Sequence, residues 1–136
     1  MALDVRGVTT LLQVFDMTRS IEFYRDVLGF SIVSTSEPAD NFYWALLKLG
    51  DATLMLNTAY EDDERPPSPD PARMSAHADT TLYFSCPDPD EAYAHLCRKG
   101  WEAEEPRNAY YGMRQVYTKD PDGYELCFQH PVAEQK

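Results

Sequence analysis

The sequence of 136 residues lacks most features of secreted or membrane-spanning proteins. Its three cysteines, Cys86, Cys97 and Cys127, are odd in number and form no CxxC pair. That spacing argues against a disulfide framework and against a zinc knuckle. No apolar run approaches the ~20 residues that cross a bilayer, and the first residues lack the apolar core of a signal peptide. We therefore expect a cytoplasmic protein that has no membrane partner.

Basic residues are also scarce, with 12 Lys and Arg against 23 Asp and Glu and a net charge of −11. Phosphate repulsion makes nucleic acid an unfavourable partner for such a chain. The acidic excess has two interpretations, which bulk charge alone does not separate: it keeps the protein dispersed in water, or it attracts cationic ligands.

Common catalytic motifs are missing as well. The sequence has no GxSxG, no phosphate-binding P-loop and no GxGxxG after a strand. Cys127 and His130 fall in a single predicted strand with their side chains on opposite faces, which excludes a nucleophile–base pair unless the strand bulges. Whether the protein is an enzyme is therefore left open.

The chain instead contains an internal repeat. A predicted strand at 10–15 is followed by Asp16 and a helical pattern that ends at Gly29. A second strand at 81–86 is followed by Asp88 and a helix that ends at Gly100. Three more strands are expected after each helix, at 30–35, 42–49 and 52–57 in the first half and at 101–103, 113–118 and 124–129 in the second.

Two halves with the same order of elements predict an α+β fold of two βαβββ modules in a single domain. We expect module 1 at about 6–58 and module 2 at about 78–130. The stretch 59–77 is rich in proline and acidic residues, which predicts an exposed linker without packed structure. A flap over the site is the alternative for this stretch.

Two motifs carry a resemblance to a known family. Phe23-Tyr24 precedes Leu28-Gly29-Phe30 in the first half, and Asp120-Pro121-Asp122-Gly123 forms a predicted turn in the second. Over residues 8–129 the chain resembles the glyoxalase/bleomycin-resistance/extradiol dioxygenase (vicinal oxygen chelate) family. The resemblance implies curled mixed sheets that enclose a cleft, and a homodimer. Members include metal-dependent lyases, isomerases and dioxygenases, and metal-free proteins that bind antibiotics.

The resemblance also implies where a metal would be held. The first-strand ligand positions fall on Thr9 and Thr81, seven residues before the two helix-starting aspartates. The last-strand positions fall on Cys127 in module 2 and on Leu54, or Met55 with a one-residue slip, in module 1. These residue types do not suit a hard or borderline divalent cation. We therefore expect no metal cofactor.

An offset ligand set is the alternative. If the segment from His77 to Ser85 is extended, His77 and Asp79 share one face and could join Glu125 and Gln13 around one divalent metal. The competing interpretation is that His77 is a solvated residue at the end of the linker and Glu125 a charge in a polar cleft.

The cleft is expected to be aromatic and polar. Its predicted lining residues are Gln13, Trp44, Asp79, Tyr83, Tyr110, Tyr111, Glu125 and Cys127. Such a surface suits a planar or cationic compound, although aromatic residues are equally common as ordinary strand residues. The sequence thus predicts a metal-free protein that sequesters or senses a small aromatic or cationic molecule. The alternatives are a metal-dependent lyase, isomerase or dioxygenase, and a plain interaction module.

Overall fold

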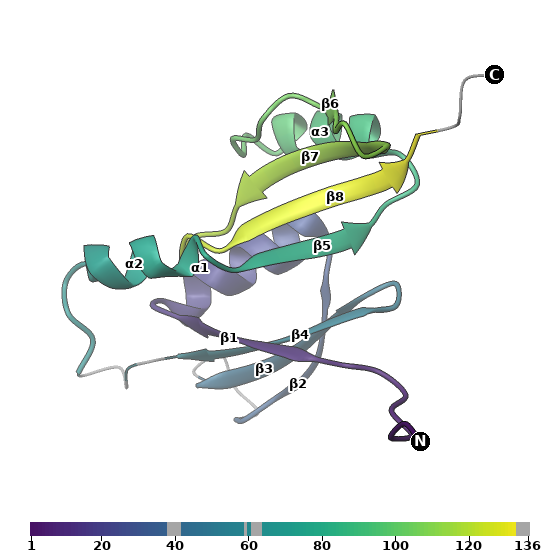
Figure 1. The fold of residues 1–136 in the computed structure, drawn as a ribbon. Coiled ribbons are helices and arrows are strands. Elements are labelled where there is room, and N and C mark those ends of the chain that lie inside the picture. The colour runs from purple at the N-terminus through teal and green to yellow at the C-terminus, as the bar shows by residue number, and fades with distance from the viewer. Residues whose placement is uncertain (38–41, 59, 61–63, 133–136) are drawn as a thin grey trace. The chain divides into compact units, whose positions relative to one another are not determined.

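The computed structural model describes residues 1–37, 42–58, 60 and 64–132 and divides into two compact units, residues 1–65 and 66–136 (Figure 1). Each unit carries one four-stranded mixed sheet with helical cover. Within the described ranges, every helix is too short or too polar to span a lipid bilayer. The predicted α+β fold of two βαβββ modules is confirmed.

The first unit follows the predicted order of elements. Its elements are β1 (Thr10–Val14), α1 (Met17–Ile21), the π-helical continuation η1 (Glu22–Leu28), β2 (Ser31–Thr35), β3 (Trp44–Leu49) and β4 (Ala52–Thr58). The sheet order is β1-β4-β3-β2, with β1 and β4 parallel. The Asp16 carboxylate accepts a hydrogen bond from the Arg19 N–H at the start of α1. Gly29 ends η1 with a φ of 100°, in the left-handed region.

The second unit repeats this topology. Its elements are α2 (Pro71–His77), β5 (Thr81–Ser85), α3 (Pro89–Arg98), β6 (Arg107–Asn108), β7 (Met113–Lys119) and β8 (Glu125–Pro131). The sheet order is β5-β8-β7-β6, with β5 and β8 parallel. The Asp88 carboxylate caps α3 by accepting from the Glu91 N–H, as Asp16 caps α1. Duplication of the module is thus visible in both topology and capping.

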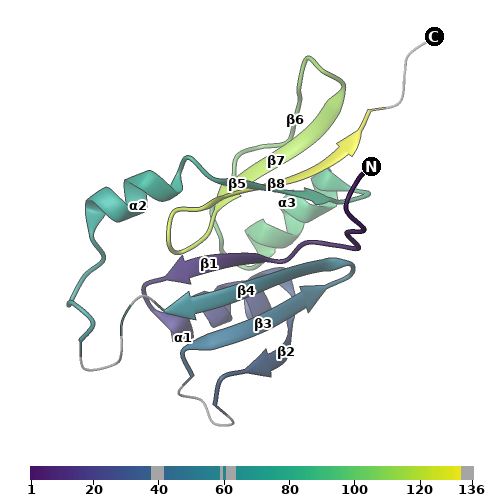
Figure 2. The ribbon, with the colours of Figure 1, turned by 60° about the horizontal axis from the view of Figure 1, so that its bottom comes forward.

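In each sheet, one face is apolar and supports the core. In unit 1, Leu12, Leu47 and Leu56 are buried, as are Phe23 and Tyr24 of the helix, which lies along one side of the unit 1 sheet (Figure 2). In unit 2, α3 packs on β7 and β8, where the buried residues are Leu96, Val116, Leu126 and Phe128. Because strand residues alternate between faces, their neighbours in sequence lie on the opposite face of each sheet.

Two predictions about the chain after module 1 were wrong, one for the linker and one for module 2. The stretch 59–77 is not without structure throughout, because α2 occupies 71–77: Asp70 caps it and Pro71 fits its first turn. The acidic residues 61–63 of the predicted linker lie outside the described residues. The expected strand at 101–103 is only a single bridge from Ala103 to Thr118, and the strand that pairs with β7 is β6. Pro106, which has no N–H to donate, separates that bridge from β6.

Helix α2 is fixed to the turn between β7 and β8. The His77 Nδ1 donates to the Asp122 carbonyl at 2.7 Å, and its ring stacks on Tyr124 with centroids 4.0 Å apart. Gly123 has a φ of +88°, and a Cβ there would lie 2.8 Å from the Met74 carbonyl oxygen. The turn and the helix therefore fit together only because position 123 carries no side chain.

We expect Gly123→Ala to lower the free energy of unfolding by at least about 2 kcal/mol, from left-handed strain plus displacement of α2. Gly100→Ala is the matched control, since Gly100 also has a positive φ (+72°) but open space around it. Gly100→Ala should lower the free energy of unfolding by only about 1 kcal/mol. Urea denaturation of both variants measures the difference, and equal losses would contradict the close approach to Met74.

Candidate functional site

The face of the unit 2 sheet that points away from α3 carries three of the predicted site residues, Tyr83, Glu125 and Cys127, and Tyr111 hydrogen-bonds to it from the turn before β7. We call it the tyrosine face; it comprises Thr81, Tyr83, Ser85, Arg107, Gln115, Tyr117, Lys119, Glu125, Cys127 and Gln129. Strand register places these side chains in rows, and the central row holds Tyr83, Cys127 and Tyr117. The opposite face is identified by Arg114, which pairs with Asp90 of α3 at 2.7 Å.

A hydrogen-bonded network occupies the middle of the tyrosine face. The Gln115 amide nitrogen donates to the Tyr111 hydroxyl and to Gln129 Oε1, each at 2.9 Å. The Gln115 amide oxygen accepts from the Tyr117 hydroxyl at 3.3 Å. Gln115 is only 2 % exposed, so all its polar atoms are satisfied inside the face. Such a network holds its members in fixed positions.

Tyr117 interacts with two other ionisable side chains of the tyrosine face, Tyr83 and Cys127. A hydrogen bond to the Tyr83 hydroxyl, together with burial and the neighbouring Cys127, raises the pKa of Tyr117. Burial likewise raises the pKa of the Cys127 thiol, and the nearby Glu125 charge adds to the effect. Both groups therefore stay protonated and neutral at physiological pH and add no charge to the central row.

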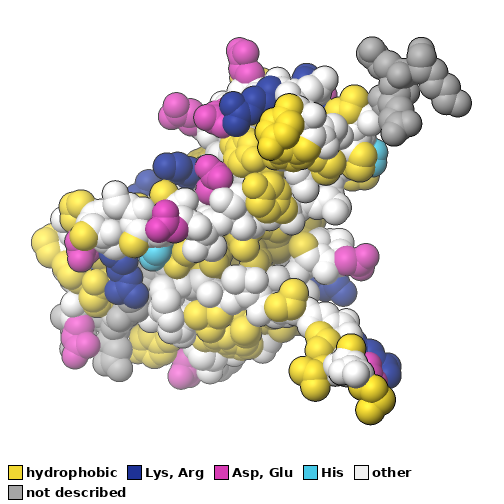
Figure 3. Space-filling model, in the orientation of Figure 1, with side chains coloured by type: hydrophobic (Ala, Val, Ile, Leu, Met, Phe, Trp, Pro, Cys, Tyr) yellow, Lys and Arg dark blue, Asp and Glu magenta, His cyan; other side chains and the backbone are white. Residues whose placement is uncertain are grey.

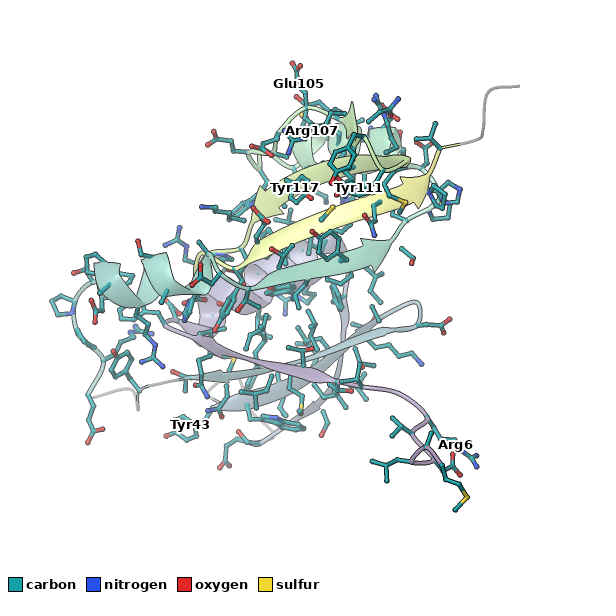
Figure 4. All side chains as sticks on the ribbon, in the orientation of Figure 1. Arg6, Tyr43, Glu105, Arg107, Tyr111 and Tyr117 are labelled. Atoms are coloured by element: carbon teal, nitrogen blue, oxygen red, sulfur yellow. The ribbon has the colours of Figure 1, made fainter. Side chains whose placement is uncertain are left out.

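Both ends of the tyrosine face carry charged side chains, Glu125 and Lys119 at one end and Arg107 at the other. At one end, Glu125 Oε1 accepts from the Thr81 hydroxyl at 2.8 Å. At the other end, the Arg107 guanidinium carbon lies 5.4 Å from the centroid of the Tyr117 ring, in cation–π contact. Figure 4 shows Arg107, Tyr111 and Tyr117 gathered beside β7. The surface is thus an aromatic strip with Glu125 beside Lys119 at one end and Arg107 at the other.

Ligand-accessible area on this strip comes from two tyrosines. Tyr83 is 55 % exposed and Tyr111 is similarly open. Figure 3 shows hydrophobic side chains over β7 and β8, whereas acidic side chains lie at several separate places on the visible face. The described acidic side chains therefore do not form one patch on that face.

The matching face of unit 1 carries two other predicted site residues. Gln13 and Trp44 lie on its non-core side, where Asn57 Nδ2 donates to Gln13 Oε1 at 3.3 Å. Thr9 and Thr53 join their hydroxyls at 2.7 Å on the same side. This face is less aromatic than its counterpart in unit 2.

Four predicted site residues, Tyr83, Tyr111, Glu125 and Cys127, are brought together on unit 2. Tyr110 is fully exposed in the turn before β7, and Asp79 lies in the exposed turn after α2, where its N–H donates to the Ala76 carbonyl. The predicted site did not include Arg107, Gln115, Tyr117 or Gln129. Strand alternation was the available signal, since it puts Gln129 on one face with Glu125 and Cys127, and Gln115 on one face with Tyr117.

The side chains at the family's metal positions do not fit a divalent metal. Thr9 and Thr81 offer neutral hydroxyls that already bond to Thr53 and Glu125. Cys127 is a buried thiol of raised pKa, and register matches it in module 1 to Met55 rather than Leu54. Across the parts of the chain that the structure describes, no three His, Cys, Asp or Glu side chains are grouped to hold a metal.

The structure contradicts one premise of the alternative metal-ligand set of His77, Asp79, Glu125 and Gln13. That premise was an extended segment from His77 to Ser85, but His77 ends α2 and the chain then turns before β5. The His77 ring is engaged by Asp122 and Tyr124 instead. A capped helix was favoured there over a strand, because Asp70 and Pro71 supply a complete start signal.

Comparison with known proteins identifies the family. The family model of the Glyoxalase/Bleomycin resistance protein/Dioxygenase superfamily matches residues 7–128. The chain belongs to this family. A search of the curated proteins by sequence finds no match.

Solved structures of the family share the whole fold. TnmS3, an antibiotic binding protein from Streptomyces sp. CB03234, is 22% identical with a TM-score of 0.69, over 96% of this chain and 100% of that one. The bleomycin resistance determinant encoded on the transposon Tn5 is 21% identical with a TM-score of 0.71, over 95% and 100%. The protein SMU.1112c is 28% identical with a TM-score of 0.73, over 93% and 100%.

The raised pKa of Tyr117 predicts a loss of stability in alkali. Above the ordinary tyrosine pKa of about 10, the unfolded chain releases this proton while the folded chain keeps it, so stability falls as pH rises. Tyr117→Phe should therefore lose less free energy of unfolding between pH 8 and pH 10.5 than the unchanged protein does. Urea titrations at both values test this, with the fully exposed Tyr110→Phe as control; equal pH dependence in all three proteins would contradict it.

Proposed function

We propose that this family member is a metal-free binding protein that sequesters or senses a small aromatic or cationic compound. The observation that carries the proposal is the tyrosine face with the adjoining Tyr111: two exposed tyrosines and the half-buried Tyr117, fixed by the Gln115 and Gln129 amides, with a carboxylate and a guanidinium at its ends. This arrangement has the elements of a small-molecule site, namely aromatic area with a few fixed polar groups.

The absence of a metal from the proposal rests on residue chemistry. The family's lyases and dioxygenases need a cation that binds two substrate oxygens, and such a cation needs carboxylate or imidazole ligands. Thr9, Thr81, Met55 and Cys127 supply neither. A neutral thiol and two hydroxyls that are already hydrogen-bonded are better suited to line a binding surface.

Two of the structural neighbours support a binding role. One is described as an antibiotic binding protein and another as a bleomycin resistance determinant. They share this fold, and we extend their kind of function to this chain. In this chain the exposed Tyr83 ring supports a binding role, since an aromatic contact contributes about 0.5–1.5 kcal/mol beyond simple burial.

Binding is tested first with bleomycin as the probe, by isothermal titration and by the shift in melting temperature. Tyr83→Ala should weaken binding by about three- to tenfold, because it removes one aromatic contact. Tyr43→Ala is the control, since Tyr43 is a comparably accessible tyrosine of unit 1 outside the tyrosine face. Equal losses in the two variants would contradict the assignment of the site.

Metal independence has its own measurement. Protein purified without chelator and then offered Zn, Mn, Ni and Fe(II) should hold well under one metal per chain by mass spectrometry. Treatment with EDTA should leave the affinity for the probe unchanged. About one metal per chain, lost on changing Glu125→Gln, would contradict the proposal and make a metal-dependent activity the next hypothesis.

A further inference from the structure

Some polar groups of the tyrosine face have no hydrogen-bond partner among the described residues, and the donors among them lie at one end of the face. Gln129 Oε1 accepts from Gln115, whereas the Gln129 amide nitrogen donates to no partner among residues 1–37, 42–58, 60 and 64–132. Arg107, in the same row, makes a cation–π contact but no ion pair with any described residue. This end of the face therefore offers hydrogen-bond donors.

The other end offers an acceptor. Glu125 uses Oε1 for the Thr81 hydroxyl, and Oε2 has no partner within the described part of the chain. Lys119 is opposite Glu125 in the register, but its side chain is exposed and forms no ion pair with that carboxylate among the described contacts. A half-buried carboxylate with one free oxygen favours a cationic or donating group beside it.

The spacing between the two ends sets a length for the ligand. Glu125, Cys127 and Gln129 lie on the same face of β8, so the two polar ends are about 13 Å apart along the strand. Between them, Tyr83 and Tyr117 lie on either side of Cys127 in the central row. Tyr117 and Cys127 add no charge to that stretch, because both remain protonated at neutral pH.

We infer that the ligand is an extended planar aromatic compound with a carbonyl oxygen at one end and a protonated amine at the other. The carbonyl accepts from the Gln129 amide beside Arg107, the rings lie on Tyr83 and Tyr117, and the amine pairs with Glu125. This assignment rests on the proposed binding function and narrows it to one ligand class and one orientation.

Gln129 and Glu125 are then the residues that determine specificity. A site whose polar groups are complemented by the ligand rejects an analogue that leaves them unpaired, because each buried unpaired group costs free energy. Each end of the ligand can therefore be removed separately. For a ligand that lacks one end, a change of the side chain that pairs with that end should leave the dissociation constant unchanged.

Three matched probes test this: acridone, which has the carbonyl but no cation; 9-aminoacridine, which is a planar cation without a carbonyl; and an acridone that carries a short aminoalkyl arm. Fluorescence titration gives their dissociation constants with the unchanged protein and with two isosteric variants, Glu125→Gln and Gln129→Glu. Isosteric changes keep the side-chain volume, and melting temperatures confirm that each variant folds.

The aminoalkyl acridone should bind most tightly. Glu125→Gln should weaken the two cationic probes by about tenfold and leave acridone within about twofold. Gln129→Glu should weaken the two carbonyl probes to a similar extent, because the amide donor is replaced by a carboxylate, and 9-aminoacridine should bind at least as tightly as before, because the new carboxylate attracts its cation.

The outcomes separate this inference from the proposed function. If all three probes bind the unchanged protein but neither variant changes their order, the binding function stands and the assigned orientation is wrong. If both variants weaken every probe equally, the orientation is again wrong. If neither bleomycin nor any acridine probe binds the unchanged protein, the proposed function fails and this assignment fails with it.

Discussion

Parallel pairing between the first and last strands of each module sets the position of every other element. Parallel neighbours cannot be joined by a tight turn, so the chain must cross over the sheet, and a helix makes that crossover. The helix covers one face of the sheet and leaves the other to different side chains. In unit 2 the pairing of β5 with β8 brings Tyr83 beside Cys127 and Thr81 beside Glu125. The tyrosine face depends on this register, because a slip of one residue would turn every one of these groups into the core.

The two modules use the same backbone for different chemistry. Where unit 2 pairs Thr81 with Glu125, unit 1 pairs Thr9 with Thr53. Where unit 2 places Tyr83 beside Cys127, unit 1 places Leu11 beside Met55. The aspartate caps and left-handed glycines recur in both halves because the backbone requires them. Side chains on the non-core faces are free of that requirement, and there the two halves have diverged.

Local signals in the sequence predicted most of the fold. Both capping aspartates, the glycine at the end of η1 and the turn before β8 depend only on neighbouring residues, and the structure has each of them. Helix α2 was missed although Asp70 and Pro71 mark its start, because prolines and acids around it indicate an open linker. Tyr83 and Glu125 were predicted from strand alternation, and Tyr111 from its place at the entry to β7. Gln115 and Tyr117 were missed because their role arises only when β7 pairs with β8, a contact between segments that no local pattern specifies.

The contacts that hold the connecting segment at both ends also limit the freedom of the chain between the modules. Arg65 is tied to unit 1 by its ion pair with Asp16 at 3.4 Å and by its position over the Phe15 ring. Asp70 begins the helix that is fixed to unit 2. Only residues 66–70 remain as a tether, and three of them are proline. A proline-rich tether is a stiff spacer rather than a flexible coil. Each module is therefore held at a high local concentration relative to the other, whichever arrangement the two adopt.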